Sequence, residues 1–437
     1  MVGSSFLRLV KRENLFDADN WYVIDKSKKN LSVFTGIGGK SDNFLTINIK
    51  YKKYNDIFSM LGAGDYLLDF SSSQSNTDLL KICIEKNIHY LSTCSLPYEE
   101  PDEHIPDYHD FCIYREMKKN TNPSSATSVI EFGMNPGMVS CFAKQAIKEI
   151  VKKDTGTFVS TNRRKLQSMI DRGEYAKVAQ QLKISTVHVS DIDTTEFKYP
   201  YKTKTIYSTW NIDAFYDETT APSEISLGTD IKIENLSKIT NDYNPNDGFF
   251  VSDKSSILTQ DQSYSPYGSF VGYIVPHEEI YSIANFLSIY KGNKLVYKPS
   301  VYFVYLPCPF AVKGLFESIS VGVDKMSKYL AAPKDIARGG EAVGIVVEGR
   351  NFQTRYFGNK LEAPIEGETP TILQVSASAM AAFRYMLDHP NQGFLFPEEL
   401  DDEEILNYAL PYMEEYVSLA LPPLKKAFFK KYNAVSE

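Results

Sequence analysis

The first 155 residues alternate short apolar runs with stretches in which apolar residues recur every three or four positions. The short runs predict β-strands, and the longer spacing predicts amphipathic helices. The predicted helices cover residues 6–10, 56–61, 79–85 and 141–151, and the predicted strands cover 21–24, 44–49, 65–70, 88–93 and 128–132. Strands and helices that alternate at this spacing indicate a doubly wound parallel sheet.

The first twenty-five residues have the order helix, strand, acid. An apolar face in Phe6–Val10 precedes the strand-like segment Trp21–Ile24, which ends in Asp25. In a dinucleotide-binding fold, the fingerprint Gly-x-Gly-x-x-Gly lies between the first strand and the first helix, and an acid about 20 residues on binds the ribose hydroxyls. Gly3 and Asp25 fit the last glycine and this acid, so we expect the first strand and the first two glycines upstream of Met1. An ordinary amphipathic N-terminal helix is the alternative.

Residues Thr35–Ser41 look like a phosphate-binding loop. They lack the spacing Gly-x-x-x-x-Gly-Lys-Ser/Thr, and the strand-like segment Phe44–Ile49 follows them instead of a helix. We therefore predict a turn between strands here.

Polar residues follow several of the predicted strands. Ligands of a parallel α/β sheet bind at the carboxyl ends of its strands, so these residues are candidates for cofactor binding, although loop polarity alone also explains them. The turn Gly133–Ser140 adds Gly and Pro, which bring backbone close to a ligand, and Asn135, which offers both a donor and an acceptor. The candidate cofactor-binding residues are Gly3, Asp25, Ser71, Ser72, Ser92, Thr93, Asn135 and Pro136.

The pattern changes at about residue 155, where strand-like segments separated by turns replace the alternation. Segments 185–191, 204–211 and 296–305 predict an α+β domain with a mixed or antiparallel sheet. Residues 237–266 are rich in Asn, Asp, Ser and Tyr and predict a mobile loop. Helical spacing returns in 373–387, 403–416 and 419–431. We expect a dinucleotide-binding domain of residues 1–137 and about 372–437, and a catalytic domain of residues 138–371.

Composition and charge narrow the partners. The five scattered cysteines contain no Cys-x-x-Cys pair, so neither a disulfide framework nor a zinc site is predicted, and the cytoplasm is the expected compartment. No run approaches 18 apolar residues, and the N-terminus has no signal-peptide pattern, so no membrane partner is expected. The net charge of −8 argues against nucleic acid and suits a cationic ligand.

Carboxylates follow several strand-like segments of the second domain. Acids gathered around a cavity hold a dication, and the indole face of Trp210 attracts a positive centre by roughly 0.5 to 2 kcal/mol. The alternatives are core packing for the tryptophan and solvated surface positions for the acids. The acids are Asp191, Asp193, Asp217, Glu218, Glu278, Glu279 and Glu341.

His277 is a candidate for proton transfer, because imidazole titrates near neutral pH. A structural histidine is the alternative reading. His188 lies in a strand-like segment and is expected to be packed, and His104, His109 and His389 have no metal-ligand spacing. We therefore predict no metal site.

Several segments, in order and spacing, resemble homospermidine synthase, a family of the saccharopine dehydrogenase-like group. The resemblance extends over about residues 1–400 and rests on Gly133–Ser140, Ser208–Asn211, Val275–Glu278, Tyr297–Val301 with Pro307–Cys308, Gly344–Val347, Leu373–Ser376 and His389–Gly393.

The resemblance implies a Rossmann-type fold and an NAD-dependent enzyme that condenses two putrescines, or putrescine and spermidine, into a homospermidine-type polyamine and releases ammonia. NAD⁺ takes a hydride, the resulting imine exchanges its nitrogen for that of the second amine, and the hydride returns. By motif position, the implied catalytic residues are Trp210, His277, Asp191, Glu218, Glu341 and Asn135. The family likeness also suggests a homodimer.

Two other functions stay open at this point. A related saccharopine dehydrogenase-like or carboxynorspermidine-type NAD(P) reductase would need arginines for a substrate carboxylate, and Arg338, Arg350 and Arg355 are candidates. A non-catalytic copy without its first strand is the other alternative. Asp25 favours NAD over NADP because a carboxylate repels a 2′-phosphate, although Lys26 and its neighbouring lysines weaken this preference.

Overall fold

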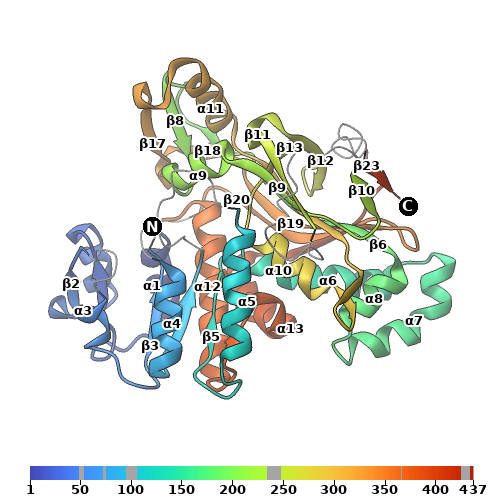
Figure 1. The fold of residues 1–437 in the computed structure, drawn as a ribbon. Helices are drawn as coiled ribbons and strands as arrows, with labels where there is room; N and C mark the ends of the chain where they lie inside the picture. Colours follow the sequence, from blue (N-terminus) through green and yellow to red (C-terminus); the bar gives the residue numbers. More distant parts are fainter. Residues whose placement is uncertain are drawn as a thin grey trace. The chain divides into compact units, whose positions relative to one another are not determined.

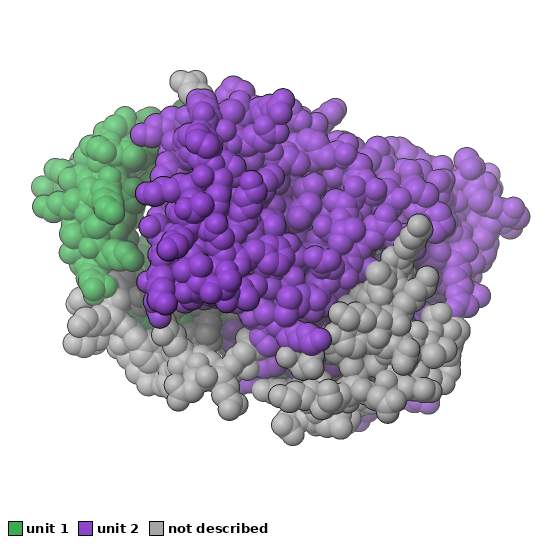
Figure 2. All heavy atoms as spheres, turned by 90° about the horizontal axis from the view of Figure 1, so that it is seen from above, with its two compact units in different colours: residues 1–101, 112–138, 372–412 green, residues 102–111, 139–371, 413–437 purple. Residues whose placement is uncertain are grey.

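The computed structural model describes residues 1–48, 54–71, 75–94, 106–233, 248–365, 367–424 and 434–436 (Figure 1). The chain forms two compact units, coloured separately in Figure 2. Unit 1 comprises Met1–Pro101, Cys112–Met138 and Ile372–Tyr412, and unit 2 comprises Asp102–Phe111, Val139–Thr371 and Met413–Glu437.

Unit 1 is built on a four-stranded parallel sheet with the order β21-β5-β4-β3. This arrangement confirms the predicted parallel sheet of alternating strands and helices. Its elements are α1 (Val2–Arg12), β1 (Val23–Asp25), α2 (Leu31–Gly36), β2 (Phe44–Thr46), α3 (Asn55–Phe58), β3 (Tyr66–Asp69), α4 (Asn76–Lys86), β4 (His89–Ser92), most of α5 (Tyr108–Asn120), β5 (Ser128–Val129), most of α12 (Pro370–Asp388), β21 (Phe394–Leu395) and most of α13 (Asp402–Met413).

Strands β1 and β2 form a separate parallel pair, with Val23 opposite Phe44 and Asp25 opposite Thr46. The connection between them contains α2, so the segment Thr35–Ser41 begins as the end of a short helix, which the sequence analysis did not predict. Phe34 is fully buried in α2 and packs against Leu7 and Phe44, which explains why this weak helix forms.

Unit 2 contains most of the remaining helices and strands. They are α6 (Met138–Lys153), α7 (Thr157–Ile170), α8 (Tyr175–Leu182), β6 (Ile184–Asp193), β7 (Glu196–Phe197), β8 (Thr205–Ser208), α9 (Ile212–Thr220), β9 (Pro222–Ser226), β10 (Ile231–Ile233), β11 (Phe249–Ser255), β12 (Gln260–Ser265), β13 (Gly268–Val275), α10 (Glu279–Phe286), β14 (Ile289–Lys291), β15 (Lys294–Tyr297), β16 (Ser300–Leu306), α11 (Pro309–Val321), β17 (Ser327–Leu330), β18 (Ile336–Arg338), β19 (Gly340–Gly349), β20 (Arg355–Glu362), β22 (Tyr416–Ala420) and β23 (Ala434–Ser436).

The main sheet of unit 2 has the order β11-β9-β16-β6-β19-β20-β22, and the β12–β13 hairpin joins it through β16. Strands β16 and β6 are parallel, and the other pairs in this sheet are antiparallel. The sheet is therefore mixed, as predicted.

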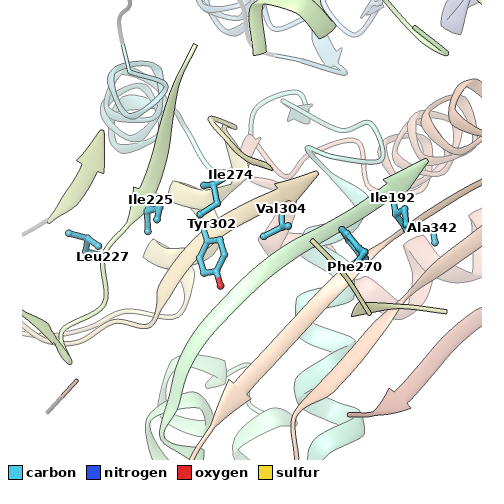
Figure 3. Packing of buried hydrophobic residues seen from close by; sticks show 8 residues of the cluster. All are labelled: Ile192, Ile225, Leu227, Phe270, Ile274, Tyr302, Val304 and Ala342. Atoms are coloured by element: carbon cyan, nitrogen blue, oxygen red, sulfur yellow. The ribbon is translucent and has the colours of Figure 1, made fainter. Parts of the chain in front are cut away.

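One face of this sheet forms a hydrophobic core (Figure 3). Ile192, Val304 and Ala342 come from three neighbouring strands and pack with Tyr302 and Ile274. Each occupies an even position in β6, β16, β19 or β13, so the odd positions of these strands point to the opposite face. The cluster comprises Ile192, Ile225, Leu227, Phe270, Ile274, Tyr302, Val304 and Ala342.

Three predictions about secondary structure were wrong. The region after residue 155 begins with helices α7 and α8, not with strands. Residues 249–255 and 260–265 of the predicted mobile loop form strands β11 and β12, which pair with β9 and β13. Residues 237–247 of that loop lie outside the described part. The predicted helix 419–431 is contradicted at its start, where Tyr416–Ala420 pairs with β20 as strand β22.

No helix among the described residues combines the length and apolar character needed to cross a membrane.

Candidate active site

Strands β6, β16 and β19 carry a buried acidic face opposite the hydrophobic core. Asp191 and Asp193 alternate with Ile192 and therefore point away from the core. In the register of the sheet, Glu341 lies opposite Asp193, and Tyr305 lies opposite Asp191. These four side chains are only 3–4% exposed. Three carboxyl groups thus share one buried surface.

Asp191 and Glu341 are joined by a side-chain hydrogen bond, so one of the two carboxyl groups carries a proton. Burial, followed by the negative charges of Asp191 and Asp193, raises the pKa of Glu341 well above its usual range. Burial and the same carboxylates also raise the pKa of Tyr305. A cation bound here would replace the shared proton as the partner of the carboxylates.

Trp210 lies in the short connection between β8 and α9. The hydroxyl group of the preceding residue, Thr209, donates a hydrogen bond to Asp193 at 2.9 Å. The following residue, Asn211, caps α9, because its side-chain oxygen accepts the backbone N–H groups of the first turn at 3.1 and 3.2 Å. Helix α9 then carries Glu218. The indole and this carboxylate are therefore held by adjacent local structures.

Helix α9 is anchored on the acidic face by Phe215, whose ring lies edge-on to that of Tyr305 at 6.4 Å. Glu218 is partly exposed as a residue, but desolvation of its carboxyl group raises its pKa to about 8. The positive charge of His277 opposes this shift, and the negative charge of Asp191 adds to it. Glu218 therefore titrates near neutral pH.

His277 lies between the end of β13 and the start of α10. Its Nδ1 atom contacts a carboxylate oxygen of Glu279 and lies 3.1 Å from one of Glu278. Its ring stands edge-on to that of Phe303 at 4.9 Å. Glu279 is fully buried and is the first residue of α10.

The carboxylates around His277 keep it protonated. Burial lowers the pKa of this imidazole, but the charges of Glu279, Glu278 and Glu218 outweigh burial and raise the pKa well above its ordinary value. His277 therefore favours its protonated, imidazolium form. Glu218, and not His277, is the group of this region whose pKa lies near neutral pH.

The same three residues could also hold a metal ion. One ligand atom each of His277, Glu278 and Glu279 lies within 4.8 Å of the others. A metal would have to displace the proton from the imidazole, which the surrounding charge retains.

A further carboxylate extends the acidic region beyond His277. Glu224, which is fully buried in β9, accepts the backbone N–H of Asp107 at 3.3 Å and the hydroxyl hydrogen of Tyr281. Burial, followed by the charges of Glu224 and Glu278, raises the pKa of Asp107 well above its usual range. The acidic region therefore extends from Glu341 to Asp107.

The predicted cofactor residues lie in unit 1. Gly3 is at the start of α1, where a Cβ atom would lie 3.7 Å from the ring of Phe70. Ser71 comes directly after Phe70, two residues beyond the end of β3. Ser92 ends β4, and Thr93 follows it. Ser72 lies outside the described residues. The residues after β3 and β4 share the carboxyl edge of the parallel sheet, as predicted.

Asp25 ends β1 and holds the turn that follows it. One carboxylate oxygen accepts the backbone N–H of Ser27 at 2.9 Å, and the other accepts the amide of Asn30 at 2.8 Å. The first oxygen also accepts the hydroxyl hydrogen of Ser27 at 3.5 Å. The oxygen bound by Asn30 keeps a second lone pair, so the carboxylate retains the capacity to accept from a ribose hydroxyl.

The turn with Asn135 and Pro136 is closed tightly after β5. The backbone N–H of Gly133 donates to the carbonyl of Pro136 at 2.8 Å. Gly137 has φ of +118°, and a Cβ atom there would lie 2.6 Å from the carbonyl oxygen of Gly133. Glycine is therefore required at position 137, because a side chain there would collide with the backbone of Gly133.

Two family models together match most of the chain. The Saccharopine dehydrogenase NADP binding domain matches residues 1–125, and the Saccharopine dehydrogenase C-terminal domain matches residues 133–418. The chain belongs to the saccharopine dehydrogenase family.

Two curated proteins that the chain resembles are homospermidine synthases. The protein of Blastochloris viridis is 25% identical over 437 residues, covering 96% of this chain and 89% of the relative. That of Mesorhizobium japonicum is 24% identical over 429 residues, covering 94% and 87%. The solved homospermidine synthase of Legionella pneumophila in complex with NAD matches with a TM-score of 0.79 at 24% identity, covering 96% and 89%. The predicted resemblance and fold class are confirmed.

The sequence analysis did not identify two residues of the acidic region, Glu224 and Asp107. Glu224 lies in a short polar strand segment, and Asp107 precedes a helix; neither pattern distinguishes a buried carboxyl group from a solvated one. Asp107 is more than 100 positions from Glu224 in the chain, so only the tertiary fold brings them together.

Proposed function

We propose that this chain is an NAD-dependent homospermidine synthase, which condenses two putrescines, or putrescine and spermidine, and releases ammonia. The observation that carries this proposal is the buried acidic region of unit 2, which contains an imidazolium and a carboxyl group that titrates near pH 8. Such a region matches a diammonium substrate. The similarity to homospermidine synthases over nearly the whole chain supports the same reaction.

When bound, NAD supplies a hydride acceptor and later returns the hydride. Its binding residues in this chain are proposed to be Gly3, Asp25, Ser71, Ser72, Ser92, Thr93, Asn135 and Pro136. The remaining steps depend on the side chains of unit 2.

We assign substrate binding to Asp191 and Glu341. Their hydrogen-bonded pair accepts the distal ammonium group of putrescine and releases its shared proton. Both carboxyl groups are buried, so their attraction for the ammonium is only weakly screened by water.

We assign proton transfer to Glu218 and His277. Glu218 accepts a proton from the substrate ammonium, which must be neutral before its neighbouring carbon loses a hydride, and its pKa of about 8 suits this task. The imidazolium of His277 donates a proton to the departing nitrogen during exchange of the imine. The face of Trp210 stabilises the transient iminium by cation–π attraction, and Asn135 is proposed to orient the substrate.

A reductase that joins an amine to a keto acid fits less well. Arg338 lies at the acidic end of β19 but is exposed and paired with Glu196 at 2.8 Å. Arg355 lies opposite Val347, near the other end of β19. At the rise of a β-strand, Val347 is roughly 20 Å from Glu341. Arg350 directly follows β19 and so lies at the same end of this strand as Arg355, away from Glu341 and Asp193 at its start. Neither Arg350 nor Arg355 therefore lies beside the acidic region.

From the family likeness we further propose a homodimer, and from the five free cysteines a cytoplasmic location.

The reaction is tested by incubating the purified chain with putrescine and NAD⁺ and no carbonyl compound. We expect sym-homospermidine and ammonia in a 1:1 ratio by mass spectrometry and ammonia assay, with no accumulation of NADH. The homospermidine synthase of Blastochloris viridis serves as the positive control. Product formation only after addition of a keto acid and NAD(P)H would replace this proposal with the reductase reading.

A further inference from the structure

We propose that Asp193 is a positioning residue that holds Trp210 in place through the hydroxyl group of Thr209. The inference rests on the proposed function, because it assigns to Asp193 the orientation of the indole that faces the substrate cation. It also separates Asp193 from the two other carboxyl groups on the same face of the sheet.

Both carboxylate oxygens of Asp193 are occupied by donors of the protein itself. Oδ1 accepts the backbone N–H of Thr195 at 2.8 Å, and Oδ2 accepts the hydroxyl hydrogen of Thr209 at 2.9 Å. Asp193 is 3% exposed, and Thr209 is 2% exposed. Burial raises the pKa of Asp193, and the hydrogen bonds from Thr195 and Thr209 oppose this shift because they stabilise the ionised form. A hydrogen bond from a hydroxyl to a buried carboxylate is among the stronger hydrogen bonds of a protein.

Asp191 and Glu341 differ from Asp193 in this respect. They share a hydrogen bond with one another, which a substrate ammonium can replace. Each oxygen of Asp193 instead accepts a hydrogen bond from a donor of the protein, one of them in the segment next to Trp210. We therefore assign to Asp193 the positioning of this segment, and the binding of the ammonium group to Asp191 and Glu341.

The segment that follows Thr209 is fixed from several directions. The carbonyl group of Thr209 accepts the hydroxyl hydrogen of Thr369 at 3.3 Å. The backbone N–H of Trp210 donates to the hydroxyl oxygen of Ser208 at 3.2 Å, and that hydroxyl donates to the carbonyl of Asn211 at 3.2 Å. The main chain on both sides of the indole is thereby held.

The indole itself is left partly exposed. Among the residues that the structure describes, no aromatic ring stacks on Trp210, whereas Trp21 packs against Phe6, Phe16 and Phe383. Trp210 is therefore not fixed by packing of the kind that holds Trp21. Its orientation depends on the main chain, and so on the bond between Asp193 and Thr209.

The test uses Trp210 as its own reporter. In a Trp21→Phe background the chain has a single tryptophan, because Trp21 and Trp210 are the only two. Thr209→Val removes the hydroxyl with little change of shape, and Thr209→Ser restores it. Thr205→Val is the matched control: Thr205 is also buried, and its hydroxyl donates to the backbone of Thr203 and not to Asp193.

We expect Thr209→Val to change the emission maximum of Trp210 and to raise its iodide-quenching constant at least about twofold. Thr209→Ser and Thr205→Val should keep both at the parent values. With putrescine, KM should rise roughly tenfold in Thr209→Val and recover in Thr209→Ser, as the loss of a hydrogen bond to a charged group predicts. Circular dichroism checks that each variant folds.

Identical emission and quenching in Thr209→Val and the parent would overturn the inference. The fluorescence readout requires no turnover, so a parent chain that ignores putrescine but shows the expected change in emission contradicts the proposed function alone. If Trp21→Phe does not fold, 5-fluorotryptophan in the otherwise unchanged chain gives one ¹⁹F resonance for each tryptophan, and Trp210→Phe assigns them. An unshifted Trp210 resonance in Thr209→Val would again contradict the inference.

Discussion

Two residues of the acidic region have pKa values that differ from those usual for their side chains. Glu218 is a carboxylic acid with a pKa of about 8, and His277 is an imidazole that stays protonated. Burial of Glu218 favours its neutral form, while the carboxylates around His277 favour the charged form of the ring. Both effects come from neighbours that are distant in the chain, so each assignment depends on the folded site.

The first prediction concerns the pH dependence of turnover. Because Glu218 must be ionised to accept a proton, activity should rise with pH through about 8 in the parent chain. Glu218→Gln should lose at least about 100-fold in kcat, the usual contribution of general base catalysis, and should lose this pH-dependent step. Rate profiles from pH 6 to 10 measure both. Asp217→Asn is the control, since Asp217 is the exposed neighbour on α9. An unchanged profile in Glu218→Gln would assign the base elsewhere.

The second prediction concerns stability and the same carboxyl group. The folded state keeps the proton of Glu218 up to about pH 8, whereas the unfolded chain loses it near the ordinary value of 4.5. Between these values the unfolded state binds fewer protons, so this group lowers stability as the pH rises. Glu218→Gln should therefore gain Tm relative to the parent chain from pH 5 to 8, with a constant difference above pH 8. A difference in Tm that does not grow over this interval would be inconsistent with the raised pKa.

The third prediction concerns the indole. Trp210→Ala should lower kcat/KM for putrescine by about 2- to 30-fold, the range that corresponds to a cation–π interaction, and Trp210→Phe should retain part of the activity. The fold should survive because Trp210 is partly exposed. Steady-state kinetics with putrescine, alongside Trp21→Phe as a control, measure the effect. Equal activity in the alanine and parent proteins would remove the indole from the mechanism.

At the scale of elements, the alternation of side chains on β6, β16 and β19 separates two environments. Even positions such as Ile192 and Val304 form the hydrophobic core (Figure 3). Odd positions such as Asp191 and Asp193 form the buried acidic face. Apolar burial on one side stabilises the sheet, and this stability offsets the cost of grouping buried acids on the other. The sheet thus keeps the acidic face fixed in register.

The fourth prediction tests this support with two positions of one strand. Ile274 on β13 is fully buried in the core cluster, whereas Val271 on the same strand is 55% exposed. Ile274→Ala should lower the free energy of unfolding by about 2–5 kcal/mol through lost contacts and a cavity. Val271→Ala should change it by less than about 0.5 kcal/mol. Urea unfolding followed by circular dichroism measures both. Similar losses in the two variants would contradict the assignment of the core.

At the scale of the whole molecule, both units carry the family relationship, since the two family models together extend from residue 1 to residue 418. Unit 1 has the parallel sheet of a dinucleotide-binding fold, and unit 2 has the mixed sheet that carries the acidic region. The proposed chemistry needs both: a hydride acceptor and an anionic surface for amines.

The fifth prediction concerns assembly. If the proposed homodimer forms, light scattering should give about twice the chain mass of 49.5 kDa at micromolar concentration. A mass equal to that of one chain across this range would rule the homodimer out.

The amount that the sequence predicts differs between the two units. In unit 1, apolar periodicity gave the strands and most helices, because each of these elements shows its buried face in local spacing. It did not predict α5, the short strand β21 or α2, whose single fully buried aromatic residue, Phe34, gives no period. In unit 2, periodicity missed helices such as α7 and α8. It treated β11 and β12 as a loop, because these strands are rich in polar residues and are fixed by pairing with β9 and β13.

For the site, residue types and motif positions selected Asp191, Glu218, His277 and Glu341, and the structure places all four in the acidic region of unit 2. Motif position selected Asp191 and not Asp193, but the local pattern gave no physical reason for this choice, because both lie on one strand face. Their difference depends on Thr209 and Glu341, which approach from other parts of the chain.

The sequence by itself determined the alternation of strands and helices in unit 1 and the family, because these follow from local spacing and from motifs that are contiguous in the chain. Tertiary structure decided which carboxyl groups meet, which of them hold a proton, and which one is committed to the Thr209–Trp210 segment. Those properties depend on strand register and on burial. Both are set by contacts between residues far apart in sequence, where no local pattern records them.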